Sequence, residues 1–390
     1  MRIVTAVVVL AGCAAPGADP ASFAAELGLD AWAGAAVAES SETIDGVTTA
    51  TFAADSGPRC LRGDPFRASV RDGASDSLLV FLQGGGACWS QFCLAVTRAP
   101  AGIPGVDILD PELTTNPFRD HDVAYAPYCD GSMFSGDTEL DDDGDRVIDR
   151  HHRGLANLTA TLELARSAFP SPSRVVLAGA SGGAYGTLLG AVLTRAVYPD
   201  AAIAVLADSG AGLARGAADP GYVRALLDEI GASPFLPVDC PDCLADGHVS
   251  GVTGWWLARD PNVRVGVFSS WYDSVLGDVF LQVPPTAFRD ELASATGALH
   301  EAWPDRYRRF VVDGRMHTTT LGDPTGIVGT DLSAVELPPG ALSLLTDLEL
   351  GRLDTTAIGE ARFADWAGAL AAGDDTVWVD RVEAPGPPPP

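Results

Sequence analysis

The chain of 390 residues contains no lysine, so all 25 of its basic side chains are arginines. Without lysine it cannot form a Schiff base to pyridoxal phosphate or to a carbonyl substrate. A phosphate loop of the Walker A type would lack its lysine, and a Ser–Lys dyad is excluded as well. The absence of lysine therefore removes several enzyme classes before any motif is considered.

Basic charge as a whole is scarce, because 25 arginines face 52 Asp+Glu and the formal net charge is −27. Such an acidic protein repels phosphate backbones, so we expect no nucleic-acid partner. Long apolar runs are also missing, because none after the first dozen residues approaches the ~20 residues that cross a bilayer. The composition, with 47% hydrophobic residues, is that of an ordinary globular protein, and we expect a monomer.

The N-terminus has the pattern of an export signal. Arg2 precedes a short apolar run, and the sequence Leu-Ala-Gly-Cys ends at Cys13. This sequence resembles the bacterial lipobox, in which the cysteine is lipidated and becomes the new N-terminus. We expect residues 1–12 to be a lipoprotein signal peptide and residues 13–40 a lipid-anchored cysteine and tether, outside the cytoplasm on a bacterial membrane. A secretory signal cleaved elsewhere is the alternative.

Removing Cys13 from the seven cysteines leaves an even number, which in an exported chain indicates disulfides. Three bridges among six cysteines allow about 15 pairings. Cys240 and Cys243 form a C-x-x-C pair with no second close Cys/His pair beside it. We therefore favour a short local disulfide there over half of a zinc site, and expect no metal.

Short apolar segments alternate with helical patterns along the chain. Strands are expected at residues 76–82, 122–126, 174–178, 203–207, 263–268 and 310–312, and helices at 155–169, 184–197 and 285–303. This alternation predicts an α/β fold of the α/β-hydrolase type, with a mainly parallel sheet and helices on both faces. We expect a catalytic domain over residues 41–382, a cap insertion at 209–262 and a disordered proline-rich tail at 383–390.

Ser181 is the candidate nucleophile. Residues 179–183 read Gly-Ala-Ser-Gly-Gly, a G-x-S-x-G motif that follows a predicted strand and precedes a predicted helix. Flanking glycines permit the sharp turn that lifts the serine hydroxyl out of the sheet. The N–H of Gly182 would then face a developing oxyanion at the helix N-terminus.

A glycine run at residues 84–86 follows another predicted strand. In hydrolases of this type a glycine-rich loop after an early strand donates a second N–H to the oxyanion. We assign the oxyanion hole to Gly85, Gly86 and Gly182. A structural turn is the alternative.

The order serine, acid, histidine along the chain restricts the remaining choices. His317 follows a predicted strand in a loop and suits a base, whereas His300 lies inside a predicted helix. Asp208 and Asp273 both follow strands, and we favour Asp273 because it comes after the later one. It would hold the tautomer of His317 and stabilise the imidazolium.

Together these segments resemble the pectinacetylesterase/Notum family of serine carboxylesterases. The resemblance is carried by residues 81–89, 128–137, 179–186 and 270–273, of which the Tyr-Cys-Asp-Gly segment beginning at Tyr128 is the most specific. It implies the roles already given to Ser181, Asp273 and His317. It also implies the disulfides Cys60–Cys129 and Cys88–Cys93, which leave Cys240 with Cys243.

The resulting hypothesis is an exported serine carboxylesterase that needs no cofactor and hydrolyses acyl, most simply acetyl, esters, with acetylated polysaccharide as a candidate substrate. We assign substrate binding to Trp89, Asp130, Tyr185 and Trp271. A lipase or depalmitoleoylase-like enzyme for longer acyl chains is one alternative. A non-catalytic surface binding protein is the other. The acidic segment 141–149 aligns poorly with an EF-hand, and we read it as a solvated hairpin.

Overall fold

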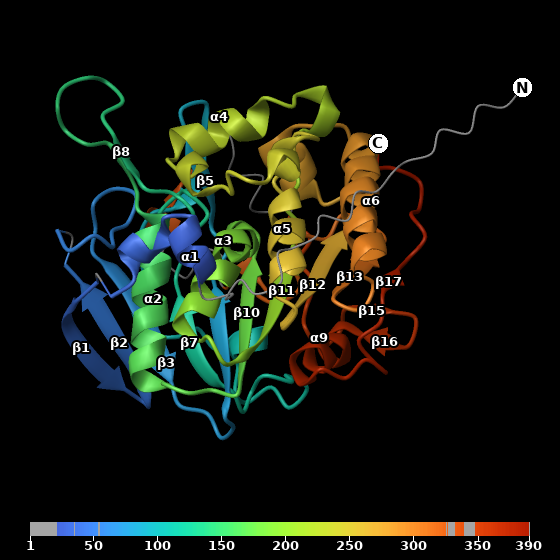
Figure 1. Ribbon diagram of the computed structural model, residues 1–390, viewed down its shortest axis with the longest axis horizontal. Coiled ribbons are helices and arrows are strands. Elements are labelled where there is room, and N and C mark those ends of the chain that lie inside the picture. The colour runs from blue at the N-terminus through green and yellow to red at the C-terminus, as the bar shows by residue number, and fades with distance from the viewer. Residues whose placement is uncertain are drawn as a thin grey trace, which may run out of the picture.

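The computed structural model describes residues 22–34, 36–53, 55–324, 326, 332–338 and 348–389. The expected signal peptide and Cys13 therefore lie outside the described residues. The centre of the molecule is a ten-stranded sheet with helices packed against it (Figure 1). Within the described residues, no helix is long and apolar enough to cross a membrane.

Seven neighbouring strands of this sheet, from β7 to β17, run parallel, and β1 to β3 extend it in antiparallel pairing. In spatial order the strands are β1 (Ala38–Ile44), β2 (Val47–Phe52), β3 (Phe66–Arg71), β7 (Asp122–Ala126), β4 (Ser77–Leu82), β10 (Arg174–Ala180), β11 (Ala202–Asp208), β12 (Val263–Ser270), β13 (Tyr307–Val312) and β17 (Arg381–Val382). The expected α/β class is thus confirmed. The carboxyl ends of the parallel strands share one edge, where ligands of such sheets bind.

The principal helices are α1 (Phe23–Glu26), α2 (Gly154–Ala168), α3 (Gly182–Val197), α4 (Tyr222–Glu229), α5 (Gly251–Arg259), α6 (Pro285–Ala302) and α9 (Phe363–Ala372). Smaller strands are β5 (Gly86–Trp89), β6 (Phe92–Val96), β8 (Thr138–Leu140), β9 (Arg150–His152), β14 (Val335–Glu336), β15 (Ala357–Ile358) and β16 (Ala361–Arg362). Short helical turns are η2 (Leu29–Trp32), η3 (Asp107–Leu109), η4 (Gly216–Ala218), η5 (Ser233–Phe235), η6 (Pro241–Leu244), η8 (Leu332–Ala334) and the π-helix η7 (Val275–Leu281).

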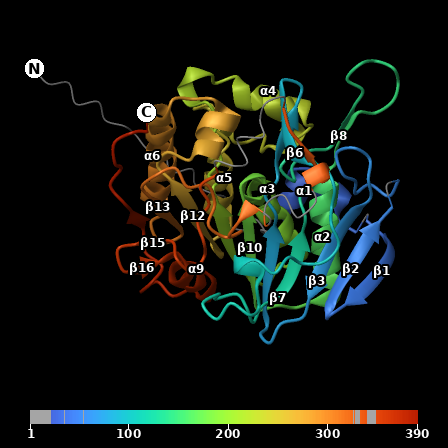
Figure 2. The same cartoon turned by 180° about the vertical axis from the view of Figure 1, so that it is seen from behind.

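Helices cover both faces of the sheet, and strand β12 shows why. Val265 and Val267 line a small cavity together with side chains of α3 and α5. The residues between and after them point to the opposite face, because side chains alternate along a strand. There Phe268 packs on Phe363 of α9 with ring centroids 5.2 Å apart. Figures 1 and 2 show α2, α3 and α5 on one side of the sheet.

The start of the described chain differs from the expected tether. Phe23 and Leu29 are buried, and Phe23 meets the ring of Trp255 edge-on at 5.8 Å between centroids. Trp32 makes a similar contact with Phe235 at 4.8 Å. Apolar side chains every few residues allow α1 and η2 to bury a face against the helix layer, so part of segment 13–40 is folded.

The C-terminal tail also differs from the expected disordered end. The N–H of Glu383 donates to the carbonyl of Val311, which continues the pairing of β17 with β13. The carbonyl of Gly386 accepts from the Tyr272 hydroxyl at 2.7 Å, and its N–H donates to Asp313 at 2.8 Å. Hydrogen bonds to the backbone of Glu383 and Gly386 therefore hold the start of the tail against the rest of the protein.

The segment expected to form a cap, residues 209–262, divides between two locations. Helix α4 lies over the carboxyl edge of the sheet, at the top of Figure 1. Helix α5 instead belongs to the layer beside α3, with Trp255 and Trp256 buried in it. The α4 part of the segment is the helix that lies over the functional edge.

Candidate active site

Ser181 lies at the sharp junction between β10 and α3. Its backbone has φ 52° and ψ −122°, a strained conformation for a non-glycine residue, and its side chain is almost completely buried. A Cβ on Gly179 would lie 2.2 Å from the carbonyl oxygen of Gly183, and one on Gly183 would lie 2.1 Å from that of Leu82. The turn therefore forms only because glycine occupies both positions.

His317 and Asp273 form a buried pair. The Nδ1 atom of His317 lies 3.0 and 2.9 Å from the two carboxylate oxygens of Asp273, and each side chain is at most 2% exposed. Asp273 also accepts hydrogen bonds from the backbone N–H groups of Val275 and Leu276, at 3.0 and 2.9 Å. These donors begin η7 and stabilise the ionised carboxylate. The carboxylate in turn requires a proton on Nδ1, which leaves Nε2 as the basic atom.

Strand β11 connects this pair to the serine. The N–H of Ser181 donates to the carbonyl of Asp208 at 2.8 Å, and the N–H of Thr318 donates to the hydroxyl of Ser209 at 3.0 Å. The predicted nucleophile and the residue after His317 thus both bond to the end of β11. The structure brings Ser181, Asp273 and His317 to the ends of β10, β12 and β13.

Asp208 and His300, the alternatives for the acid and the base, have other partners. The carboxylate of Asp208 accepts from the N–H of Thr319 at 2.9 Å instead of bonding to His317. His300 lies on α6, where its Nδ1 donates to the carbonyl of Tyr307 at 2.8 Å. The geometry therefore favours the same base and acid as the chain-order argument.

The glycine run lies directly beside the nucleophile turn. Gly86 and Gly182 share the wall of one pocket with Ser181, as an oxyanion site requires. A Cβ on Gly182 would lie 2.7 Å from the carbonyl oxygen of Gly86. Gly85 is set back from this wall, and a Cβ there would meet the ring of Tyr128 at 2.5 Å. The tyrosine ring therefore leaves no room for a side chain at Gly85.

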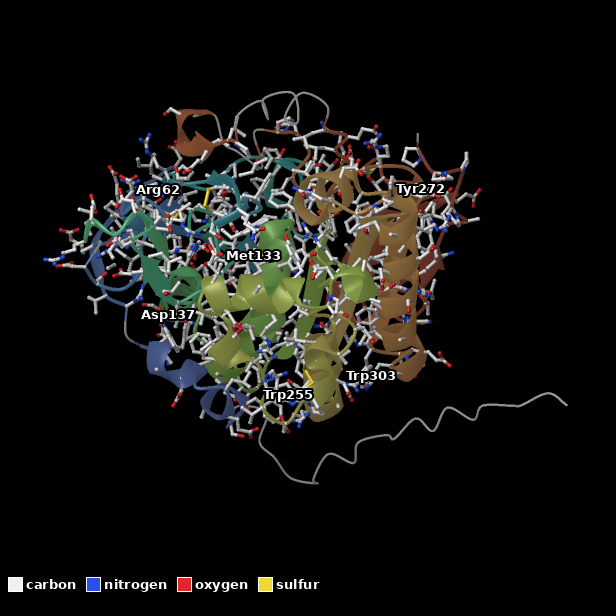
Figure 3. The ribbon with its side chains drawn as sticks, turned by 90° about the horizontal axis from the view of Figure 1, so that it is seen from above. Arg62, Met133, Asp137, Trp255, Tyr272 and Trp303 are labelled. Carbon is white, nitrogen blue, oxygen red and sulfur yellow. A yellow bond between two sulfur atoms is a disulfide. The ribbon has the colours of Figure 1, made fainter. Side chains whose placement is uncertain are left out.

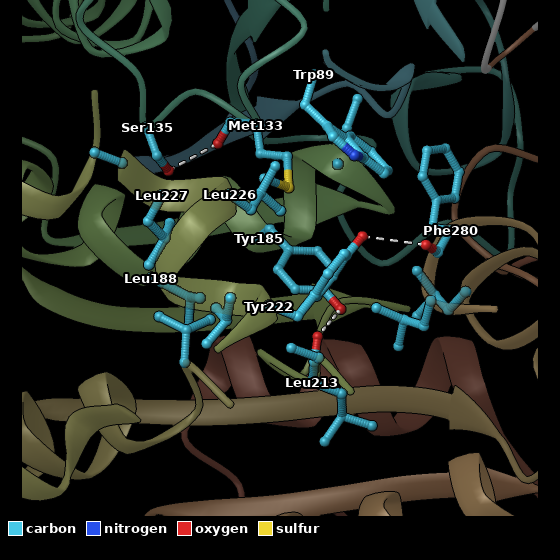
Figure 4. Close-up of a pocket in the computed structure, with 18 of the residues that line it drawn as sticks. Trp89, Met133, Ser135, Tyr185, Leu188, Leu213, Tyr222, Leu226, Leu227 and Phe280 are labelled. Carbon is cyan, nitrogen blue, oxygen red and sulfur yellow. Dashed lines mark hydrogen bonds between the residues drawn. The ribbon is translucent and has the colours of Figure 1, made fainter. Parts of the chain in front are cut away.

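The pocket that has Ser181 in its wall is almost entirely apolar (Figure 4). Its volume is about 80 Å³. Its deeper walls come from α3, α4 and the segments that follow them, with Leu188, Leu189, Leu213, Val223, Leu226, Leu227, Ala232, Leu236, Val249, Val252, Leu276 and Leu281. An apolar ligand that entered it would lose its contact with water along its whole length.

Three aromatic side chains of the pocket wall, those of Trp89, Tyr222 and Phe280, form a cluster with Phe92. Trp89 packs on Phe92 at 5.2 Å between ring centroids, and Phe92 meets Phe280 edge-on at 5.6 Å. Tyr222 of α4 approaches Trp89 at 6.3 Å, and its hydroxyl donates to the carbonyl of Phe280 at 3.3 Å. Figure 4 shows that hydrogen bond joining α4 to η7 beside the pocket.

Of the expected substrate-binding residues, Trp89 and Tyr185 line the pocket. The hydroxyl of Tyr185 donates to the carbonyl of Leu213 at 2.8 Å, and burial together with the charge of Asp273 raises its pKa. The tyrosine therefore stays neutral and braces the pocket wall.

Asp130 and Trp271 are not in the pocket, which corrects our expectation for both. Asp130 is fully buried, and its carboxylate accepts from the N–H and the hydroxyl of Ser132 at 2.7 and 2.5 Å. Trp271 donates from its indole nitrogen to the carbonyl of Glu383 at 2.6 Å. Asp130 therefore shapes the loop that carries Met133, and Trp271 binds the C-terminal tail. Figure 3 shows Met133 near the centre of the molecule seen from above, with Tyr272 toward α6.

The sequence analysis missed most of the pocket wall, including Met133, Tyr222 and Phe280. One signal was available, because residues 222–229 place apolar side chains at Val223, Leu226 and Leu227 on a single helical face. The other positions come from loops and from η7, which have no periodic pattern.

The described part of the chain contains three disulfides, and each is the pair that the resemblance implied. They are Cys60–Cys129, Cys88–Cys93 and Cys240–Cys243. Cys88–Cys93 joins directly opposite residues of β5 and β6, the hairpin that carries Gly86 and Trp89. It therefore restrains one wall of the pocket.

The acidic hairpin between β8 and β9 stands away from this site (Figure 1). Carboxylate oxygens of Asp141, Asp143 and Asp149 lie within 4.8 Å of one another. Asp141 accepts from the N–H groups of Gly144 and Arg146 at 2.7 and 2.8 Å, so it closes turns of its own loop.

A parallel sheet with a serine on a strand–helix turn and a His–Asp pair at later strand ends defines an α/β-hydrolase type of protein. Comparison with known families agrees, because residues 39–216 match the family model described as pectinacetylesterase. The chain is similar to pectinacetylesterases over this segment, which confirms there the resemblance stated above. Pectinacetylesterases are carboxylic ester hydrolases, so the protein is an enzyme of that class. No curated protein matched the chain.

The matched segment includes Ser181, the glycine run and Asp208, but it ends before Asp273 and His317. The assignment of the base and the acid therefore depends on chain order and on the geometry of the buried pair.

Proposed function

We propose that the protein is a serine carboxylesterase whose acyl pocket accepts chains of about four to eight carbons. The observation that carries this proposal is the apolar pocket that begins at Ser181. A single water needs roughly 10–15 Å³ of cavity volume, so about 80 Å³ holds roughly five to eight groups of that size. An acetyl group would leave most of it empty.

The reaction proposed is a two-step acyl transfer. Ser181 attacks the ester carbonyl while His317 removes the hydroxyl proton, and Asp273 stabilises the imidazolium that forms. The N–H groups of Gly86 and Gly182 would hold the oxyanion, where one donor contributes roughly 3–4 kcal/mol. The alcohol leaves with the proton from His317. Water then releases the acyl group through the same base.

Removal of acetyl groups from a polysaccharide is the second candidate, and the family match favours it. The two candidates differ in the acyl group and share the machinery. They make opposite predictions for a series of esters of increasing chain length.

The test compares kcat/KM for p-nitrophenyl acetate, butyrate, octanoate and palmitate. We expect a maximum at butyrate or octanoate, about tenfold or more above acetate, because each buried methylene contributes roughly 0.8 kcal/mol. Ser181→Ala is the control and should abolish turnover of all four esters while the protein stays folded. A maximum at acetate would favour the deacetylase.

A variant that narrows the pocket sharpens the test. Leu226 lines the pocket but is only partly buried, so Leu226→Trp adds volume without straining the core. It should lower kcat/KM for octanoate about tenfold and leave acetate within about twofold. Leu164→Trp, a partly buried leucine on α2 outside the pocket, is the matched control. Equal losses for both esters in Leu226→Trp would contradict the acyl assignment.

A further inference from the structure

Asp208 ends β11, the strand between the nucleophile strand and the strand of the catalytic acid. It is completely buried. Its carboxylate accepts from the N–H of Thr319 at 2.9 Å, the N–H of Thr320 at 2.8 Å and the hydroxyl of Thr320 at 2.5 Å. All these donors belong to the loop that directly follows His317.

The backbone of Asp208 bonds to the turn that carries Ser181. The carbonyl of Asp208 accepts from the N–H of Ser181 at 2.8 Å. The next residue, Ser209, accepts from the N–H of Thr318 through its hydroxyl at 3.0 Å. Ser209 and Thr318 both have left-handed backbones, with φ of 57° and 55°. Such conformations persist only where neighbouring contacts hold them.

We propose that Asp208 is a positioning residue for catalysis, which holds the His317 loop through its carboxylate and the Ser181 turn through its carbonyl. The proposal rests on the serine carboxylesterase function given above. A displacement of about 1 Å between reacting groups costs roughly a hundredfold in rate. A residue that bonds to both halves of the site determines that separation.

These contacts favour an ionised carboxylate. The three donors converge on Oδ2, and the N–H of Thr319 also lies 3.1 Å from Oδ1, so an amide in its place would turn its NH₂ group toward that N–H. Burial raises the pKa of Asp208 to about 6, against the lowering effects of the hydrogen bonds from Thr319 and Thr320 and of the charge of His317. At neutral pH the carboxylate is therefore charged, and it adds a second negative charge near the imidazolium that forms during the reaction.

The experiment compares the full-length wild type with Asp208→Asn on p-nitrophenyl butyrate from pH 5 to 9. We expect kcat to fall roughly 10- to 100-fold while KM stays within about twofold, because Asp208 does not line the pocket. The acid limb of kcat/KM should move to lower pH, because the imidazolium loses a neighbouring negative charge.

Asp122→Asn is the matched control. Asp122 begins β7 and therefore lies at the amino-terminal ends of the parallel strands, away from the site. It also accepts a backbone hydrogen bond, from the N–H of Gly73 at 2.8 Å. Its replacement should leave kcat and the pH profile unchanged. A kcat for Asp208→Asn within twofold of wild type would overturn the proposal, and so would a loss of kcat with an unmoved acid limb.

If Asp208→Asn does not fold, two variants of Thr320 test the positioning role of Asp208 instead. Thr320→Val removes only the hydroxyl bond and should lower kcat severalfold, whereas Thr320→Ser keeps that bond and should restore kcat to within about twofold of wild type. Equal kcat in both variants would overturn the proposal. A wild type without Ser181-dependent hydrolysis would instead refute the proposed function, and the role of Asp208 with it.

Discussion

At the scale of single residues, backbone N–H groups stabilise the buried charges of the site. Asp273 accepts from Val275 and Leu276, and Asp208 accepts from Thr319 and Thr320. Fixed N–H donors cost no side-chain entropy and do not move during the reaction. The missing lysine therefore removes nothing that this machinery uses, and the negative charges beside His317 remain available to the imidazolium.

A buried histidine outside the site gives a prediction about acid stability. His152 is fully buried, and burial lowers its pKa from 6.5 to about 4, although its Nδ1 donates to the carbonyl of Asp130 at 3.1 Å. Between those values the unfolded state binds more protons, so the free energy of unfolding falls as pH falls. The loss amounts to about 3 kcal/mol at most.

His152→Gln should remove this dependence. Urea denaturation at pH 7.5 and 4.5 should show a smaller loss of stability in the variant than in the wild type. Asp208 changes the free energy of unfolding in the opposite direction. Its raised pKa stabilises the folded state as pH falls toward 4. Both proteins share that contribution, so it cancels in the comparison. An identical pH dependence in the two proteins would refute the role of His152.

At the scale of elements, the C-terminal tail supports the loop of Asp273, the proposed catalytic acid. Glu383 accepts from the indole of Trp271 at 2.6 Å, and Gly386 accepts from the hydroxyl of Tyr272 at 2.7 Å. Both donors directly precede Asp273, whose geometry against His317 they therefore restrain. The tail is part of the active-site architecture although it contains no reacting group.

Deleting residues 383–390 tests this role, because the deletion keeps β17 and removes both acceptors. We expect kcat to fall about tenfold and the melting temperature to drop, since each lost hydrogen bond contributes roughly 0.5–1.5 kcal/mol. Deleting only residues 388–390 should change neither quantity. A shortened enzyme with wild-type kcat would show that the acid loop needs no support from the tail.

At the scale of the whole molecule, the net charge of −27 should select against anionic substrates. We compare p-nitrophenyl butyrate with the p-nitrophenyl half-ester of glutaric acid, which carries a carboxylate at the far end of the acyl chain. Raising the salt concentration screens repulsion, so kcat/KM should increase for the anionic ester and stay nearly constant for the neutral one. The same response for both esters would exclude an effect of net charge.

The disulfides bear on the compartment in which the whole protein works. Cys60–Cys129 joins residues 69 apart in sequence, and such bridges persist in oxidising compartments. They fit the expectation, drawn from the N-terminal sequence, that the protein works outside the cytoplasm.

Much of the fold was predictable because its signals are local. The apolar segment at 76–82 became β4, the segment at 174–178 became β10, and the helical pattern at 285–303 became α6. The antiparallel strands β1 to β3 were not predicted. β1 is exposed along its whole length and has no alternating pattern, so pairing with neighbouring strands determines its conformation.

The sequence by itself determined the nucleophile turn and the glycine loop, because glycine and serine at fixed spacing encode those turns locally. Chain order selected Asp273 and His317, but only the tertiary structure joined them, across 44 positions. The structure alone showed that Asp208 bonds to a loop 111 residues away. It alone showed that α4 and η7 contribute to the walls of the pocket at Ser181. Contacts between distant segments depend on how the sheet orders its strands, which no local pattern specifies.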